Sequence, residues 1–138
     1  MSVFVDTSAL YALLVRTEED HDIVVDAFSG LLKAHRRLVS TNYVLLETCA
    51  LLQHRFGLAA VRDFENRLVP LLGVHWVDEG LHRRALERLF STDRRGLSLV
   101  DSVSFVLMEA EGIQEALALD QDFEDQGFQV IPTRRGER

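Results

Sequence analysis

Residues 2–15 read SVFVDTSALYALLV, and this stretch decides the fold. Its first part, Ser2 to Asp6, is a short apolar run with strand character, and its second part, Ser8 to Val15, has a helical pattern. The same alternation of short apolar runs and longer helical patterns continues along the chain. Strands that alternate with helices predict parallel strands joined by right-handed crossovers. The expected fold is therefore a three-layer α/β/α sandwich with a central parallel sheet.

The remaining elements follow from the same periodicity and from the residues that separate them. Helices are predicted over residues 20–37, 42–56, 59–72, 81–90 and 99–111, and strands over residues 38–40, 74–77, 115–119 and 128–131. Gly57 and Gly112 stand where helices end in a left-handed residue, and Thr41 and Ser98 stand where N-caps belong. These end signals support the assignment.

The composition is that of one globular domain. The 138 residues are 47% hydrophobic and 27% charged with only two prolines, which excludes a disordered or fibrous chain. We expect one domain over residues 1–132 and a short tail over residues 133–138. No run is apolar over the ~18 residues of a membrane span, no basic region precedes the first apolar stretch, and Cys49 is the only cysteine. The expected location is a reducing cytoplasm.

The net charge of −7 weighs against a nucleic-acid binder that relies on a broad basic surface. Bound divalent cations would offset part of this charge. Arginine supplies nearly all the positive charge, Lys33 being the only lysine, and arginine is the better bidentate phosphate ligand. The charge objection is weakened but not removed.

Four carboxylates occupy positions where a soluble protein normally avoids a charge. Asp6 and Asp120 end apolar runs, Asp101 lies in the first turn of a predicted helix, and Glu47 interrupts the apolar face of another. Functional groups of open parallel sheets gather beyond the carboxyl ends of the strands, so we expect all four at one edge. A carboxylate in an apolar setting needs an ion pair, hydrogen bonds or a bound cation.

Three of these carboxylates also have a purely structural explanation. Asp6 could cap the following helix, Asp101 could complete a capping box with Ser98, and Asp120 could open a turn. Capping cannot explain Glu47, because its neighbours three and four residues away are apolar. For Glu47 the alternative is a buried ion pair with an arginine. The joint arrangement of the four favours a cation site.

Oxygen ligands alone suit a hard cation, Mg²⁺ or Mn²⁺. The histidines show no ligand spacing and one cysteine cannot form Cys-x-x-Cys, so zinc is not indicated. The chain also lacks the glycine-rich loops of nucleotide-binding proteins and the Gly-x-Ser-x-Gly elbow of serine hydrolases.

Four segments in order carry a family resemblance: VFVDTSAL at residues 3–10, the helix with Glu47, LSLVDS at residues 97–102, and ALDQDF at residues 118–123. Together they resemble the PIN-domain nucleases, and most closely the small VapC-type toxin ribonucleases. The resemblance runs from residue 3 to about residue 131 and so covers nearly the whole chain.

The resemblance implies a Rossmann-like sandwich with a metal-dependent endoribonuclease site that hydrolyses RNA phosphodiester bonds with Mg²⁺ or Mn²⁺. The catalytic, metal-binding quartet of the family matches Asp6, Glu47, Asp101 and Asp120. Asp122 matches an additional metal ligand.

Two supporting features belong to the same resemblance. Thr7 or Ser8 matches the hydroxyl that supports the first aspartate. Ala118 departs from the family pattern, because many relatives have Thr or Ser there, and a hydrogen bond behind the late aspartate is thereby in doubt.

Arg94 and Arg95, in the polar loop ahead of Asp101, are the candidates for contacts to the RNA backbone, with a solvated loop as the alternative. VapC-type proteins pair with a small antitoxin that blocks the acidic site, and they commonly dimerise. The implied partners are therefore an RNA substrate, an antitoxin and a second copy of the chain, with no membrane.

Other families fit the residues less well. An aspartyl-nucleophile phosphatase needs a second aspartate where Ser8 stands, and a phosphoreceiver domain needs a lysine on a late strand, whereas Lys33 lies in an early helix. The remaining alternative is a PIN-like binding or assembly module without catalysis. The intact acidic positions weigh against it.

Overall fold

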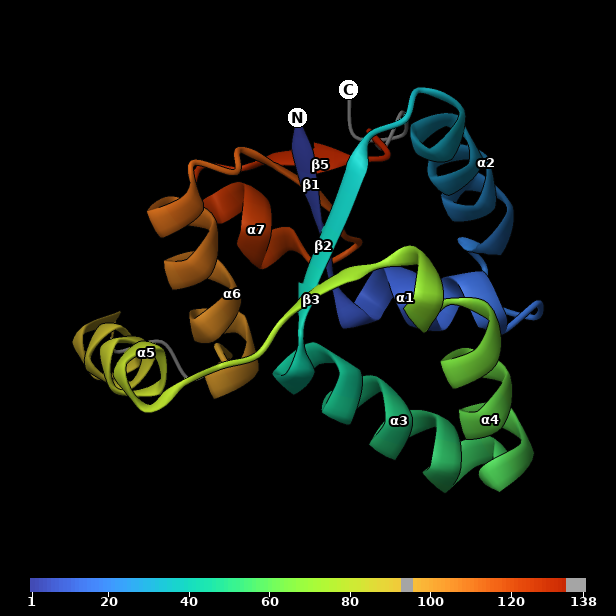
Figure 1. Ribbon diagram of the computed structural model, residues 1–138, viewed down its shortest axis with the longest axis horizontal. Helices are drawn as coiled ribbons and strands as arrows, with labels where there is room; N and C mark the ends of the chain where they lie inside the picture. Colours follow the sequence, from blue (N-terminus) through green and yellow to red (C-terminus); the bar gives the residue numbers. More distant parts are fainter. Residues whose placement is uncertain (93–95, 134–138) are drawn as a thin grey trace.

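The computed structural model describes residues 1–92 and 96–133 and contains one five-stranded sheet in the order β3-β2-β1-β4-β5 (Figure 1). Every neighbouring pair is parallel. The strands are β1 (Ser2–Val5), β2 (Arg37–Thr41), β3 (Gly73–His75), β4 (Glu115–Leu117) and β5 (Gln129–Ile131). The parallel sheet that the alternating pattern predicts is confirmed.

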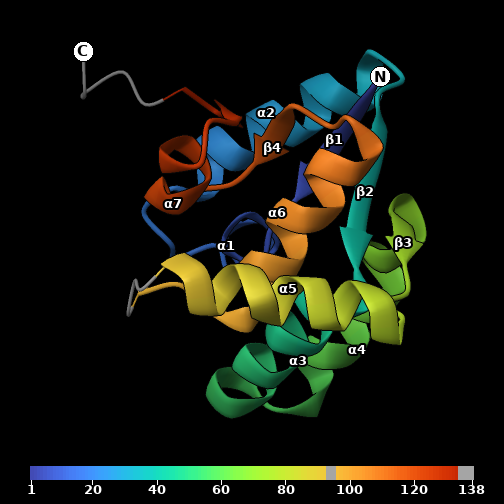
Figure 2. The same ribbon diagram turned by 90° about the vertical axis from the view of Figure 1, so that its left-hand side faces the viewer.

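Helices cover both faces of the sheet and its carboxyl end. They are α1 (Thr7–Leu14), α2 (His21–Lys33), α3 (Asn42–Phe56), α4 (Leu58–Arg67), α5 (Glu79–Thr92), α6 (Leu99–Glu111) and α7 (Gln121–Asp125), with a 3₁₀ turn over Val69–Leu71. Figure 1 shows α1 and α2 on one side of the sheet, α6 and α7 on the other with α5 outside α6, and α3 and α4 at the carboxyl end. In Figure 2, which faces the left-hand side of that view, α5 and α6 lie in front of the sheet. None of the described helices is long and apolar enough to cross a membrane.

The largest differences from the sequence prediction have local reasons. The helix predicted to run to residue 37 ends at Lys33, and His35 follows with a positive φ of 56°. The helix predicted to run to residue 72 ends at Arg67, because Pro70 lacks the amide hydrogen that would continue it. Helix α7 was expected as a turn, since five residues are too few to show a helical period.

An aromatic cluster fixes α6 and α7 on the sheet. Phe105 meets Phe123 edge to face with ring centroids 4.9 Å apart, and stacks on Phe128 at 5.7 Å. Phe123 also stacks on Phe4 of β1 at 6.2 Å. Phe4, Phe105 and Phe123 are fully buried, so the cluster combines apolar burial with favourable ring geometry.

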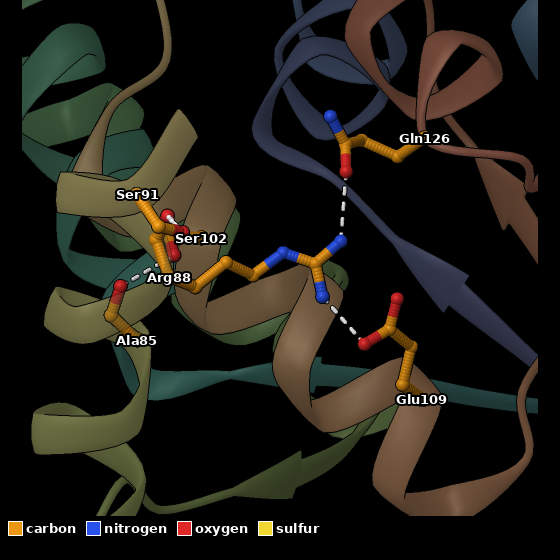
Figure 3. A network of polar contacts seen from close by, with 6 residues as sticks. All are labelled: Ala85, Arg88, Ser91, Ser102, Glu109 and Gln126. Carbon is orange, nitrogen blue, oxygen red and sulfur yellow. Dashed lines mark hydrogen bonds and ion pairs between the residues drawn. The ribbon is translucent and has the colours of Figure 1, made fainter. Parts of the chain in front are cut away.

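Arg88 ties α5 to both of the neighbouring helices (Figure 3). Its Nη1 donates to Glu109 Oε1 at 2.5 Å and its Nη2 donates to Gln126 Oε1 at 2.7 Å. The guanidinium carbon lies 5.6 Å from the ring centroid of Phe105. Ser102 adds a second link, because its hydroxyl donates to the Ala85 carbonyl at 2.6 Å. Arg88 therefore connects the helix that carries Asp101 with the helix that begins after Asp120.

We expect Arg88→Ala to lower the free energy of unfolding by about 1–2 kcal/mol, because it removes a hydrogen bond, an ion pair and a cation–π contact together. Arg83→Ala is the matched control. Its ion pair with Glu79 is exposed and should contribute less than about 0.5 kcal/mol. Urea denaturation of both variants measures the difference, and equal losses would contradict the role given to Arg88.

Candidate active site

Asp6 lies at the carboxyl end of β1 and caps α1. Its Oδ2 accepts hydrogen bonds from the Ser8 amide at 3.2 Å and from the Ser8 hydroxyl at 2.7 Å. The Ser8 hydroxyl in turn accepts from the Leu119 amide at 2.9 Å. Ser8 thus joins Asp6 to the segment that leads to Asp120, although 111 residues separate Ser8 from Leu119.

Thr7 contacts a different element. Its hydroxyl donates to the Val44 carbonyl at 3.4 Å and accepts from the Thr48 hydroxyl at 3.3 Å, and both residues belong to α3. Of the two hydroxyls proposed to support Asp6, only Ser8 has a hydrogen bond to that carboxylate among the described residues. Thr7 instead fixes α3, which carries Glu47, against the start of α1.

Asp101 and Asp120 also stabilise the starts of helices, Asp101 from the first turn of α6 and Asp120 as the N-cap of α7. Ser98 and Asp101 form a reciprocal capping box at the start of α6, with hydrogen bonds of 3.3 and 3.1 Å. Asp120 accepts from the Asp122 amide at 2.9 Å. The structural explanations for Asp6, Asp101 and Asp120 therefore all hold. A carboxylate has two oxygens with several lone pairs, so capping does not prevent the same group from binding a cation.

The capping geometry brings carboxylates together. One carboxylate oxygen from each of Asp101, Asp120 and Asp122 lies within 4.8 Å of the others. Asp6, Glu47, Asp101 and Asp120 line one cleft of about 630 Å³. The tightest group thus includes Asp122, and Asp6 and Glu47 extend the acidic surface around it.

Glu47 lies on α3 and reaches the cleft half-buried. Within residues 1–92 and 96–133 it forms no ion pair with an arginine. The structure therefore does not support a buried ion pair for Glu47. The charge of Glu47 repels that of Asp101, and this repulsion adds to the effect of burial in raising the pKa of the Asp101 carboxyl.

Burial and mutual repulsion disfavour the ionised forms of this cluster. Burial raises the pKa of Asp6 from 3.8 to about 7; the Ser8 hydrogen bonds oppose the rise, and the charges of Asp101 and Asp120 add to it. Burial likewise raises the pKa of Asp101 to about 6, against the hydrogen bonds from Ser98 and with further increases from Asp120 and Glu47. Like charges in a low-dielectric site have this effect, and a bound cation would reverse it.

The raised pKa of Asp6, caused mainly by burial and further by repulsion, predicts a pH-dependent stability of the metal-free protein. Folded Asp6 keeps its proton up to about pH 7, whereas the unfolded chain loses it near pH 3.8, so the folded state binds more protons between these values. The free energy of unfolding should therefore fall as pH rises from about 4 to about 7. The upper limit of this contribution is about 4 kcal/mol.

Asp6→Asn should remove the Asp6 part of this dependence, while the raised pKa of Asp101 leaves a part in the variant. At pH 8 without metal the variant should be more stable than wild type, and at pH 4 the two should be alike. Chemical denaturation across this range, with the exposed Asp26→Asn as control, measures the effect. A wild-type protein that gains stability between pH 4 and 7 relative to Asp6→Asn would contradict the repulsive arrangement.

The donor set fits a hard divalent cation. It consists of carboxylate oxygens, the ligands that Mg²⁺ and Mn²⁺ prefer, and one cation could neutralise charges that otherwise repel. Asp101, Asp120 and Asp122 are placed to hold such an ion, and Asp6 and Glu47 could complete its surroundings or hold a second.

Two other residues of the cleft were not singled out as site residues in the sequence. His54 and Ser98 line the cleft beside the carboxylates. His54 follows Glu47 by seven residues on the same helix, and this spacing places both on one face. The spacing could have revealed His54 once Glu47 was assigned. Arg94 and Arg95, proposed for RNA contacts, lie outside the described residues.

The chain is similar to known proteins over most of its length. The family model of the PIN domain matches residues 3–129. The chain is 36% identical over 127 residues to the 23S rRNA-specific endonuclease VapC20 from two strains of Mycobacterium tuberculosis, covering 91% of this chain and 95% of the relative. The crystal structure of M. tuberculosis VapC20, a sarcin–ricin loop cleaving toxin, matches with a TM-score of 0.80 and 34% identity over 91% of this chain and 95% of that one.

Proposed function

Because this chain belongs to the PIN-domain family, we propose that it is a metal-dependent endoribonuclease and the toxin of a type II toxin–antitoxin pair. One observation carries the proposal: carboxylate oxygens of Asp101, Asp120 and Asp122 lie within 4.8 Å of one another, and Asp101 and Asp120 line a cleft together with Asp6 and Glu47. The PIN-domain match over residues 3–129 includes all five of these residues, and the likeness to VapC20 extends over 91% of the chain.

The proposed cofactor is Mg²⁺ or Mn²⁺, held by Asp101, Asp120 and Asp122 with Asp6 and Glu47 as further ligands. When bound, such an ion lowers the pKa of its water and offsets negative charge on the phosphate. The carboxylates hold the ion. Without it their negative charges would repel the RNA phosphate, so the phosphate binds only when the metal ion is present. Ser8 orients the Asp6 carboxylate through its 2.7 Å hydrogen bond.

The proposed substrate is ribosomal RNA, and the sarcin–ricin loop of 23S rRNA is the first site to test, by analogy with VapC20. The proposed partners are a small antitoxin that covers the acidic cleft and a second copy of the chain in a homodimer. Such a protein would act in the cytoplasm, where ribosomes are found.

Incubation of the purified protein with a sarcin–ricin loop hairpin and with intact ribosomes tests the proposal. We expect cleavage at a discrete position with Mn²⁺ or Mg²⁺, and none with EDTA. Primer extension maps the cut. Cleavage that is unaffected by EDTA would contradict the metal dependence, and failure to cleave either substrate or total RNA would favour a non-catalytic PIN-like module.

A further inference from the structure

One wall of the acidic cleft is a single face of α3. Glu47, Ala50, Leu51 and His54 all line the cleft, and their spacings of three, four and seven residues place them on one side of the helix. The wall therefore has a carboxylate nearest the start of α3, a small apolar surface in the middle, and an imidazole two turns further along.

His54 differs chemically from the other residues around the cleft. Those other residues contribute carboxylates, hydroxyls and apolar groups: Asp6, Thr7, Ser8, Glu47, Ala50, Leu51, Ser98, Asp101 and Asp120. Among the described residues that line the cleft, His54 thus offers the only side-chain N–H group. A phosphodiester has only acceptor oxygens, so it needs donors or cations around it.

The imidazole of His54 is available for such a contact. His54 is exposed, and its side chain makes no hydrogen bond or ion pair within the part of the chain that the structure describes. The next residue, Arg55, instead has a structural role that joins α3 to α1. Arg55, also in the last turn of α3, donates to the Tyr11 hydroxyl at 2.9 Å and lies 5.4 Å from the centroid of that ring.

We propose that His54 binds the RNA backbone by donating an imidazole N–H to a phosphate a few nucleotides from the scissile one. This inference rests on the proposed ribonuclease function. Seven residues of helix separate Glu47 and His54 by about 10 Å along the axis. At a rise of about 3.4 Å per nucleotide in a stacked strand, this length corresponds to about three nucleotides, so His54 meets a phosphate other than the scissile one. Ala50 and Leu51 face the nucleosides between the two phosphates.

Steady-state cleavage of the sarcin–ricin loop hairpin tests this role. His54→Ala should raise KM about tenfold, the effect of losing one hydrogen bond to a charged group, and should change kcat by less than about twofold. His54→Gln keeps an N–H donor and should recover part of the loss. Gln53→Ala, an exposed neighbour on α3 that does not line the cleft, should leave KM and kcat unchanged.

Two further measurements separate RNA binding from other effects. Mn²⁺ affinity by calorimetry should be the same in His54→Ala and wild type, because His54 is not a proposed ligand. In an Asp101→Asn background, with enough Mn²⁺ to load the weakened site, hairpin affinity by fluorescence anisotropy should fall about tenfold on adding His54→Ala. If wild type cleaves RNA but His54→Ala changes neither KM nor hairpin affinity, the inference about His54 is overturned and the proposed function is not. A wild-type protein that cleaves no RNA would overturn the proposed function and this inference with it.

Discussion

Asp101→Asn is expected to lower RNA cleavage by about a hundredfold to a thousandfold without unfolding the protein. Among Asp101, Asp120 and Asp122, whose carboxylate oxygens lie within 4.8 Å of one another, Asp101 is the buried residue. Its loss therefore removes a negative metal ligand where little water is present to stabilise charge. Asparagine has nearly the same shape, and its amide oxygen can still accept from the Ser98 amide. Since burial and neighbouring carboxylates raise the pKa of Asp101, its neutral replacement should also fold readily without metal.

Cleavage rates under single-turnover conditions measure this effect, with thermal unfolding as the check on folding. Asp26→Asn provides the matched control, because Asp26 is exposed on α2 and outside the cleft. It should cleave at the wild-type rate. A folded Asp101→Asn variant that retains wild-type activity would contradict the assignment of the cleft as the active site.

Phe123→Ala is expected to lower the free energy of unfolding by about 3–5 kcal/mol, the usual loss for a fully buried phenylalanine. Phe123 contacts Phe4, Phe105 and Phe128, so it joins α7 to β1, α6 and the entrance of β5. Its removal should also reduce metal affinity, because α7 holds Asp122 and begins after Asp120.

Urea denaturation measures the stability loss, and two variants bracket it. Phe123→Leu keeps much of the buried volume and should lose less. Phe90→Ala removes a ring that is 75% exposed and should change stability by less than about 0.5 kcal/mol. Equal losses for Phe123→Ala and Phe90→Ala would show that the aromatic cluster does not support the site.

The long helices and the parallel pairing of the strands were the parts of the fold most accessible from sequence. The helices Asn42–Phe56 and Leu99–Glu111 match their predicted limits, because a capping residue and a glycine bracket each one. Helix α7 was not predicted, because its five residues are too few to show a helical period. The 3₁₀ turn at Val69–Leu71 was missed because its apolar residues continue the pattern of the preceding helix.

The candidate site was predictable at the level of the sheet edge but not of individual distances. Alternating strands and helices place Asp6, Glu47, Asp101 and Asp120 near one edge, and the structure brings them to one cleft. Sequence could not indicate that Asp122 lies closer to Asp101 and Asp120 than the other two carboxylates do. That arrangement depends on the short helix α7, whose first residues turn around the Asp120 cap.

The structure also removes an apparent conflict between capping and catalysis. Asp6, Asp101 and Asp120 each satisfy a helix start, and each also faces the shared cleft. Capping fixes the position of each carboxylate, and none of the arginines or lysines in residues 1–92 and 96–133 forms an ion pair with Asp6, Asp101 or Asp120. The caps can therefore be understood as the means by which this fold holds like charges close together.

Calorimetric titration of Mn²⁺ into wild type and Asp101→Asn tests the central claim most directly, because it requires no knowledge of the RNA that is cut. We expect saturable binding of Mn²⁺ to wild type and much weaker binding to Asp101→Asn. Binding to wild type at pH 6 should release protons, because Asp6 and Asp101 are partly protonated at that pH. Equal binding by the two proteins, or no binding to wild type, would contradict a metal site in the acidic cleft.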